Sequence, residues 1–232
     1  WTAPVIASGE AVTGYKVYER AVHGLSEVSE VFESAGVSEE VMDHFLDPAE
    51  SDMVIDTLVH DGRGSTDVST VVSGLSGGVE YTYVVSALSL SGEGERSESL
   101  GVSTSPAAPS ELASSEVRSD GVDLVWSAPA VSTGSAVTGF IVYVNDGAGG
   151  AVLSTVACDG TGSTTAACSV DGLSGGREYV FAVSALSAAG EGDRSAALAV
   201  STAPAAVAGL SSVGQTSSSI ELAWDGLVAS GG

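Results

Sequence analysis

The chain repeats itself, and this internal repeat constrains its fold more than any other feature of the sequence. The stretch GLSGGVEYTYVVSALSLSGEGERS at residues 74–97 returns as GLSGGREYVFAVSALSAAGEGDRS at residues 172–195. An earlier stretch, WTAPVIASGEAVTGYKVY at residues 1–18, returns as WSAPAVSTGSAVTGFIVY at residues 126–143. Recurrence of this kind predicts several copies of one structural unit in tandem.

The spacing of the matches differs along the chain. The match that starts at Trp1 is offset by 125 residues, whereas the later match is offset by 98. The first copy therefore contains 27 residues that the second lacks, between Tyr18 and Met53. A third copy is indicated by residues 217–232, which match residues 119–134.

Within each copy, apolar residues alternate with polar or small ones, which is the pattern of half-buried β-strands. Examples are Val122, Leu124 and Trp126 in one segment and Tyr179, Phe181 and Val183 in another. Clusters of Gly, Ser, Pro and Asp separate these segments at intervals of about 8–12 residues, as in sandwiches and barrels. The pattern predicts an all-β fold of antiparallel strands.

The second copy resembles the fibronectin type III domain throughout its length. Its segments PSELASSEVRSDGVDLVWSAP, VTGFIVY and GLSGGREYVFAVSALSAAGEGDRS carry the marks of that family. The marks are a Pro-x-x-Leu opening (Pro109, Leu112), a Trp in the second strand (Trp126), a Leu six residues before the corner Tyr (Leu173, Tyr179) and a Gly-x-Gly-x-x-Ser turn (190–195). The resemblance implies a seven-stranded antiparallel Greek-key sandwich, in which Tyr81 and Tyr179 are structural corner residues bonded to nearby backbone.

We therefore expect tandem sandwiches of this type, with boundaries taken from the repeat. Residues 1–104 are expected to form a first domain that lacks its first strand and most of its second. Residues 105–202 are expected to form a complete domain, and residues 203–232 the first strands of a third. An incomplete sandwich would expose core and unpaired backbone, so the chain is expected to be a segment of a longer tandem array.

A swapped assembly is the alternative to a longer array. In it, residues 203–223 of one chain complete the first domain of a neighbouring chain. Trp224 would then duplicate Trp1, so the longer array is favoured.

Two separate sandwich cores are expected from the alternating residues. Aromatic residues mark these cores, Trp1 and Tyr81 in the first copy and Trp126 and Tyr179 in the second, and Trp224 is the structural core residue expected in the third copy. Their neighbours on the same faces are Tyr15, Val17, Tyr83 and Val85 in the first copy and Phe140, Val142, Phe181 and Val183 in the second.

The extra residues of the first copy, about 22–48, predict two short helices as an insert. Ser26 and Gly36 are the cap and stop of the first helix, and Ser38 and Pro48 those of the second. Helices this short need a surface to pack on. We expect them to pack at the junction with the second domain; the alternatives are that they cover only the first domain or contact a neighbouring chain in a fibre. Their apolar residues are Val28, Val31, Phe32, Val41, Met42, Phe45 and Leu46.

The chain has two cysteines, Cys158 and Cys168, which flank the segment DGTGSTTAA. The repeat aligns them with His60 and Thr70 and places them on either side of a hairpin turn. A disulfide is expected if they face each other in a non-hydrogen-bonded pair, and two buried free thiols are the alternative. A disulfide would indicate an oxidising compartment, in agreement with an extracellular or cell-surface location.

Patterns that resemble catalytic or metal sites lack the context that such sites need. GLSGG fits the nucleophile-elbow pattern, but a predicted strand follows it and the second copy contains no His. His23, His44 and His60 have no compact metal-ligand spacing, and the acidic turn at residues 61–67 is not a calcium-binding EF-hand loop. We therefore expect no catalytic, cofactor-binding or metal-binding residues.

Composition argues against two classes of partner. Seven Lys and Arg against 30 Asp and Glu give a net charge of -23, which repels nucleic acid phosphates and anionic lipids. No apolar run approaches the roughly 18–20 residues needed to span a bilayer. The expected partners are neighbouring domains of the same longer chain and, in a fibre, other copies of it.

The function expected from these features is structural and non-enzymatic. Repeats without a recognisable site favour an extracellular segment of a tandem array that forms a filament, stalk or surface fibre. The alternatives are an adhesive or ligand-binding module and a spacer of a secreted polysaccharide-degrading enzyme.

Overall fold

The structure, a computed structural model, describes residues 10–24, 52–147 and 155–226. These residues form fifteen β-strands and contain no helix. The chain divides into two compact units. The first unit comprises Trp1–Leu75 and Glu80–Ser103, and the second comprises Ser76–Val79 and Thr104–Gly232. The strands are β1 (Gly14–Gly24), β2 (Asp52–Asp61), β3 (Glu80–Ser89), β4 (Gly92–Arg96), β5 (Leu100–Ser103), β6 (Ser110–Val117), β7 (Gly121–Ser127), β8 (Val137–Val144), β9 (Thr155–Asp159), β10 (Ala167–Asp171), β11 (Glu178–Ser187), β12 (Gly190–Arg194), β13 (Leu198–Ser201), β14 (Ser211–Gln215) and β15 (Ile220–Ala223).

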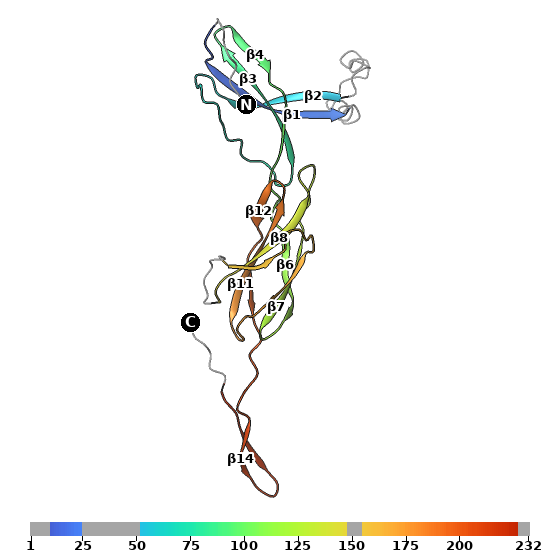
Figure 1. The fold of residues 1–232 in the computed structure, drawn as a ribbon, viewed down its shortest axis with the longest axis vertical. Helices are drawn as coiled ribbons and strands as arrows, with labels where there is room; N and C mark the ends of the chain where they lie inside the picture. The colour runs from blue at the N-terminus through green and yellow to red at the C-terminus, as the bar shows by residue number, and fades with distance from the viewer. Residues whose placement is uncertain (1–9, 25–51, 148–154, 227–232) are drawn as a thin grey trace, which may run out of the picture. The chain divides into compact units, whose positions relative to one another are not determined.

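The second unit contains a two-layered sandwich (Figure 1). One layer has the strand order β10-β7-β6, and the other has the order β12-β11-β8-β9 with β13 also paired to β11. The paired strands are antiparallel in both layers. These strands form where apolar residues alternate, since every second side chain of a strand points to the same face.

The core of this sandwich lies between the two layers. Phe181, Val183 and Val122 are completely buried. The rings of Trp126 and Phe140 lie edge to face, with their centroids 5.4 Å apart. Burial of this aromatic and aliphatic cluster supplies the main driving force for folding of the unit.

The final strand of each repeat is broken into two segments by a serine. In the second unit the Ser195 amide donates to the Val183 carbonyl, and the Ser195 hydroxyl accepts from the Val183 amide at 3.1 Å. Ser97 and Val85 make the same two hydrogen bonds in the first unit. The sandwich therefore has eight strand segments, β6 to β13, where the resemblance implies seven strands.

The first unit contains one five-stranded sheet. Its order is β2-β1-β3-β4, with β5 also paired to β3. The register repeats that of the second unit, because Tyr15 lies opposite Ala87 as Phe140 lies opposite Ala185. The two copies therefore build the same sheet from the same pattern.

The extra residues of the first copy begin as a continuation of β1. β1 and β2 continue as a two-stranded ribbon beyond β3, pairing residues 20–24 with residues 52–56 (Figure 1). Residues 22–24, the first residues of the expected insert, lie in β1, and their backbone pairs with β2. The two predicted helices lie outside the described residues, together with Val28, Val31, Phe32, Val41, Met42, Phe45 and Leu46.

Residues 69–73 are not part of a sheet, although the repeat aligns them with β10. In the second unit β10 is held by its ladder with β7. Among the described residues of the first unit, no strand corresponds to β7, so this backbone has no partner strand. A strand pattern in the sequence therefore gives a strand only where a neighbour can pair with it.

The strands β14 and β15 pair with each other as a hairpin. Thr216 and Ser219 close its turn through backbone and hydroxyl contacts. Trp224, which follows β15, is 61% exposed. Among the described residues β14 and β15 pair only with each other, so the core expected around Trp224 stays a prediction.

Candidate functional site

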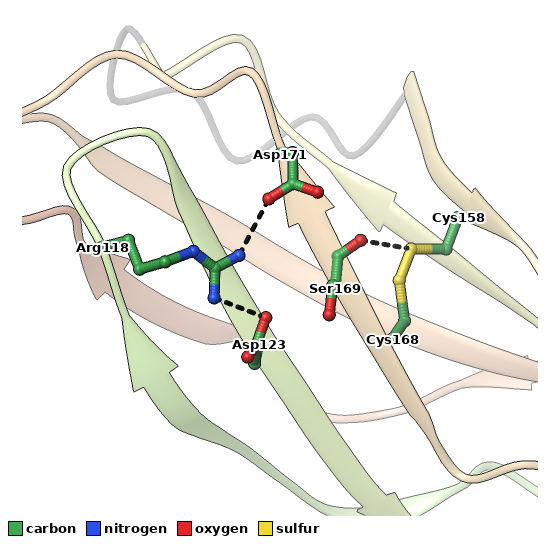
Figure 2. The surroundings of a disulfide bond; sticks show 6 residues. All are labelled: Arg118, Asp123, Cys158, Cys168, Ser169 and Asp171. Atoms are coloured by element: carbon green, nitrogen blue, oxygen red, sulfur yellow. Dashed lines mark hydrogen bonds and ion pairs between the residues drawn. A yellow bond between two sulfur atoms is a disulfide. The ribbon is translucent and has the colours of Figure 1, made fainter.

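Cys158 and Cys168 form a disulfide that joins the two layers of the sandwich (Figure 2). Cys158 lies on β9, at the edge of one layer, and Cys168 lies on β10, at the edge of the other. Their Cα atoms are 6.6 Å apart, farther than in either kind of antiparallel pair. The predicted disulfide is confirmed, but the predicted hairpin is wrong because β9 pairs with β8 and β10 pairs with β7.

Ion pairs lie beside the disulfide (Figure 2). Arg118, in the turn between β6 and β7, donates to Asp123 at 2.7 Å and to Asp171 at 2.8 Å. The hydrogen bond from Arg118 lowers the pKa of Asp123. The Cys158 sulfur lies 3.7 Å from the carbonyl oxygen of Ser169. These ion pairs join the β6–β7 turn to β7 and to the end of β10.

In the first unit, His60 and Thr70 occupy the positions of the two cysteines. Their side chains are joined by a hydrogen bond of 3.2 Å. They line a cavity of about 30 Å³ together with Tyr15, Val17 and residues 67–69. Such a cavity holds about one water, whereas pockets for small organic ligands measure about 300–1,000 Å³. The cavity is too small to be a substrate site.

The GLSGG segment of the second copy forms a turn and not a nucleophile elbow. Gly172 and Gly176 have φ angles of 79° and 71°, a left-handed conformation that glycine adopts without strain. The Ser174 amide donates to the Tyr179 hydroxyl at 2.9 Å, and the Ser174 carbonyl accepts from Thr202 at 2.7 Å. Tyr179 thus makes the corner hydrogen bond that the resemblance implies, and the turn leads into β11.

A cluster of four polar side chains, the tyrosine–glutamate cluster, links β8, β11 and β12. Glu191 accepts hydrogen bonds from Ser184 at 2.6 Å and from Tyr143 at 2.8 Å. The Arg194 guanidinium stacks on the Tyr143 ring, 3.6 Å from its centroid. The hydrogen bonds from Ser184 and Tyr143 lower the pKa of Glu191. These contacts join three neighbouring strands on the face of the sheet that points away from the core.

The first unit contains the same cluster with an added cation. Glu93 accepts from Ser86 at 2.6 Å and from Tyr18 at 2.7 Å, and Lys16 donates to it at 2.8 Å. Arg96 stacks on the Tyr18 ring and also pairs with Glu93. Hydrogen bonds from Lys16, Ser86 and Tyr18 lower the pKa of Glu93 to about 2.

A bidentate ion pair extends this cluster along β1 and β2. Arg20 donates to Asp56 through Nε at 2.8 Å and through Nη2 at 3.0 Å. Arg96 reaches the same carboxylate at 3.4 Å. The hydrogen bonds from Arg20 lower the pKa of Asp56. Two-pronged pairing of this kind fixes the relative position of the two strands.

The chemistry of these clusters does not suit catalysis. A general acid or base works best when its pKa lies near the working pH. Glu93, Glu191 and Asp56 all have lowered pKa values, so they are ionised at neutral pH and have no proton to give. Their oxygens accept hydrogen bonds from neighbouring strands, which is a structural role.

The carboxylates of the acidic turn at residues 61–67 bond to the turn itself. Asp61 accepts from the Arg63 amide at 3.2 Å, and Asp67 accepts from the Ser65 hydroxyl at 2.7 Å. In the part of the chain that the structure describes, no three His, Cys, Asp or Glu side chains gather to hold a metal ion.

The lowered pKa of Glu93 predicts how the first unit responds to acid. A carboxyl whose pKa is about 2 when folded and about 4.5 when unfolded stabilises the fold above pH 4.5 and loses that contribution as the pH falls toward 2. The Glu93→Gln variant should therefore be less stable than the wild type at pH 7, with a difference that shrinks between pH 4.5 and 2. Urea unfolding followed by circular dichroism at several pH values measures this difference.

The matched control for this prediction is Glu95→Gln, which changes an exposed neighbour on the same strand. A difference between wild type and Glu93→Gln that stays constant from pH 7 to 2 would contradict the role given to the Glu93 carboxylate.

Residues 107–201 match the sequence profile of the fibronectin type III domain. The match covers β6 to β13, which form the two-layered sandwich with its corner tyrosine. These residues are a fibronectin type III domain. The resemblance drawn from the sequence is thereby confirmed for the second copy.

A curated protein and two solved structures are similar to parts of the chain. Chitinase A1 of Niallia circulans is 37% identical over an alignment of 131 residues that covers 52% of this chain. The chain spans only 17% of the length of that protein. A two-domain fibronectin type III segment of chicken tenascin has 14% identity and a TM-score of 0.41, with 85% of this chain and 87% of that chain covered. The domain of human fibronectin type III domain containing protein 3 has 20% identity and a TM-score of 0.39, with 45% and 92% covered.

The aromatic residues that we assigned to cores differ in their surroundings. Trp126 and Tyr179 are buried in the fibronectin type III domain. Tyr81 is half-buried in the first unit, and Trp224 is exposed. Trp1 lies outside the described residues.

Sequence reasoning missed the tyrosine–glutamate cluster in both copies. The sequence does contain a sign of it: Ser86, Glu93 and Arg96 of the first copy recur with the same separations in the fibronectin type III domain. We interpreted these residues only as part of a glycine-rich turn. Their contact with Tyr18 depends on strand pairing across more than 60 residues of sequence, which the local pattern does not reveal.

Proposed function

We propose that this chain is a non-catalytic structural segment of a longer secreted protein, where it spaces other domains of a polysaccharide-degrading enzyme. The observation that carries the proposal is the 37% identity to chitinase A1 over 131 residues. The matched stretch is 17% of that protein, so a shared spacing module explains the likeness without a shared active site. Fibronectin type III domains are typically non-catalytic modules.

The described residues support a structural role. The serines and carboxylates that recur in both copies are used in turns and strand clusters, as Ser174 and Glu191 illustrate. The disulfide between Cys158 and Cys168 agrees with secretion into an oxidising compartment. None of the described residues forms a helix long and apolar enough to cross a membrane.

A second candidate function is a segment of a filament, stalk or surface fibre. The internal repeat favours it, since at least two copies of one strand pattern follow each other in this chain. The two candidates differ in what surrounds the segment. Reading the open reading frame on both sides of residues 1–232 separates them, because a hydrolase domain supports the spacer and a long run of further copies supports the fibre.

A spacer is expected neither to cleave nor to bind the polysaccharide itself. The purified 232-residue chain, incubated with colloidal chitin, should release no soluble sugar and should remain in the supernatant on centrifugation. Chain that sediments with chitin in a saturable manner would contradict the spacer proposal and favour an adhesive module. A chitin-binding protein and serum albumin are the positive and negative controls for sedimentation.

A further inference from the structure

Four residues of the first copy, Ser76–Val79, belong by their contacts to the second unit. They include the last three residues of the GLSGG segment at residues 74–78. The Thr104 hydroxyl donates to the Ser76 carbonyl at 2.7 Å, and the Gly78 amide donates to the Ser105 carbonyl at 2.8 Å. Thr104 and Ser105 are also part of the second unit, so this turn is held entirely within it.

The shape of this turn is determined by its own repeat. Gly78 has a φ angle of 71°, and so has Gly176 at the equivalent position of the second copy. There the Thr202 hydroxyl donates to the Ser174 carbonyl at 2.7 Å, and the Gly176 amide donates to the Ala203 carbonyl at 3.0 Å. Because both copies make the same bonds, the turn offers a preformed backbone surface to whatever contacts it.

A loop of the fibronectin type III domain binds the backbone of the first-copy turn. The amides of Ser132 and Gly134, in the loop between β7 and β8, both donate to the Gly78 carbonyl, at 3.3 and 3.2 Å. A Cβ atom at Gly134 would lie 2.6 Å from the Gly78 carbonyl carbon, and Gly78 is buried. Only a residue without a side chain permits two backbones to approach this closely.

A second glycine of the domain meets the linker that follows Ser105. Pro106 is buried, and a Cβ atom at Gly192, on β12, would overlap its carbonyl oxygen. The equivalent residue of the first copy is Gly94. Within the described residues, the nearest atom to a Cβ at Gly94 would be the Ala87 carbonyl oxygen at 3.5 Å, which is an ordinary contact. The strand pattern thus leaves room for a side chain at this position, and the close approach of the linker removes it at Gly192.

We propose that Gly134 and Gly192 form a docking site through which the fibronectin type III domain recognises the turn and linker of the copy that precedes it. Its partner is a GLSGG turn that is closed by a threonine and followed two residues later by a proline, as Thr104 and Pro106 illustrate. Two loop amides bind the last carbonyl of the turn, and the two glycines leave room for its backbone.

Recognition of this kind depends on backbone shape. The site accepts a preceding copy whose turn carries this glycine pair, and it excludes one whose turn or linker is bulkier. The inference does not depend on the spacer proposal, because copies follow one another in a spacer as well as in a fibre.

Amide hydrogen exchange in the 232-residue chain, followed by NMR, tests the loop side of the contact. In the wild type, the Ser132 amide should exchange about tenfold or more slowly than the amide of Thr164, which lies in an exposed loop. Gly134→Ala should remove this protection, because its methyl group displaces the turn. Gly192→Ala should weaken it by displacing the linker, and Gly94→Ala, the matched control, should leave it unchanged.

A pair of variants tests the turn side. Gly78→Asn and Gly176→Asn place the same side chain at the same φ angle, which asparagine tolerates better than most residues. A Cβ at Gly78 would already lie 3.5 Å from the Ala130 carbonyl oxygen, so the rest of the asparagine side chain would crowd the docking loop. Gly78→Asn should therefore remove the protection of the Ser132 amide, and Gly176→Asn should keep it.

The amides of Leu124 and Val142, in the domain core, report whether each variant is folded and should exchange as in the wild type. A wild-type Ser132 amide that exchanges as fast as that of Thr164 overturns the proposal, and this comparison needs no variant. Protection of Ser132 that survives Gly134→Ala also overturns it, as does an equal effect of Gly78→Asn and Gly176→Asn on that amide.

Discussion

Replacing Trp126 with alanine is expected to lower the free energy of unfolding of the fibronectin type III domain by about 3–5 kcal/mol. Trp126 is 8% exposed and packs edge to face on Phe140. Removal of its ring leaves a cavity between the two layers. Its indole nitrogen has no hydrogen-bond partner in the described part of the chain, so lost packing accounts for the effect. Urea unfolding measured by circular dichroism at low protein concentration gives the change.

Trp224→Ala is the matched control, because the repeat aligns Trp224 with Trp126 while its side chain is 61% exposed. This substitution is expected to change the free energy of unfolding by less than about 0.5 kcal/mol. A loss below about 1 kcal/mol for Trp126→Ala would mean that the inner and outer faces of β7 are assigned the wrong way round.

Replacing both Cys158 and Cys168 with alanine should cost about 2–3 kcal/mol of stability in the chain-entropy account of disulfides. The bond closes a loop with a sequence separation of 10 and restricts the unfolded chain accordingly. It also holds the edges of two layers together, so we expect the amides of β9 and β10 to lose protection first in hydrogen exchange. Urea unfolding of the variant and the wild type measures the difference.

Reduction supplies the control for the cysteine pair. A reducing agent should bring the wild type to the stability of the double variant and leave the variant unchanged. If both thiols of freshly isolated protein are alkylated without prior reduction, the disulfide and the assignment to an oxidising compartment are both wrong.

Local patterns in the sequence were sufficient to predict the strands of the second unit. Alternation placed Phe181 and Val183 on one face, and the glycines of the GLSGG segment marked a turn that needs a left-handed residue at Gly172. Both features depend on neighbours along the chain. They can therefore be derived without knowledge of the strand order.

Strand partners could not be predicted in the same way. The nine residues between Cys158 and Cys168 resemble a hairpin loop, yet the strands on either side belong to different layers. The partner of β9 is β8 and that of β10 is β7, and these ladders are set by packing of the whole sandwich. Residues 69–73 illustrate the same limit, since their pattern predicts a strand and their surroundings provide no ladder.

The polar contacts of the candidate site were the hardest to predict. The bond between Tyr18 and Glu93 joins residues 75 positions apart, and it forms only because β1, β3 and β4 are adjacent. The lowered pKa of Glu93 follows from that adjacency. The composition shows that the chain is acidic. It does not show which carboxylates have a lowered pKa because side chains of neighbouring strands donate hydrogen bonds to them.

The bond between Cys158 and Cys168 also determines how far the chain can lengthen when its ends are pulled. The enclosed residues cannot extend while the bond is intact, because the two Cα atoms stay 6.6 Å apart. A fully extended chain spans about 3.5 Å per residue, so breaking the bond would release about 30 Å of additional length. Under tension, the unfolded unit would thus be shorter with the disulfide intact and longer with it reduced. The redox state of its surroundings would determine which length it reaches.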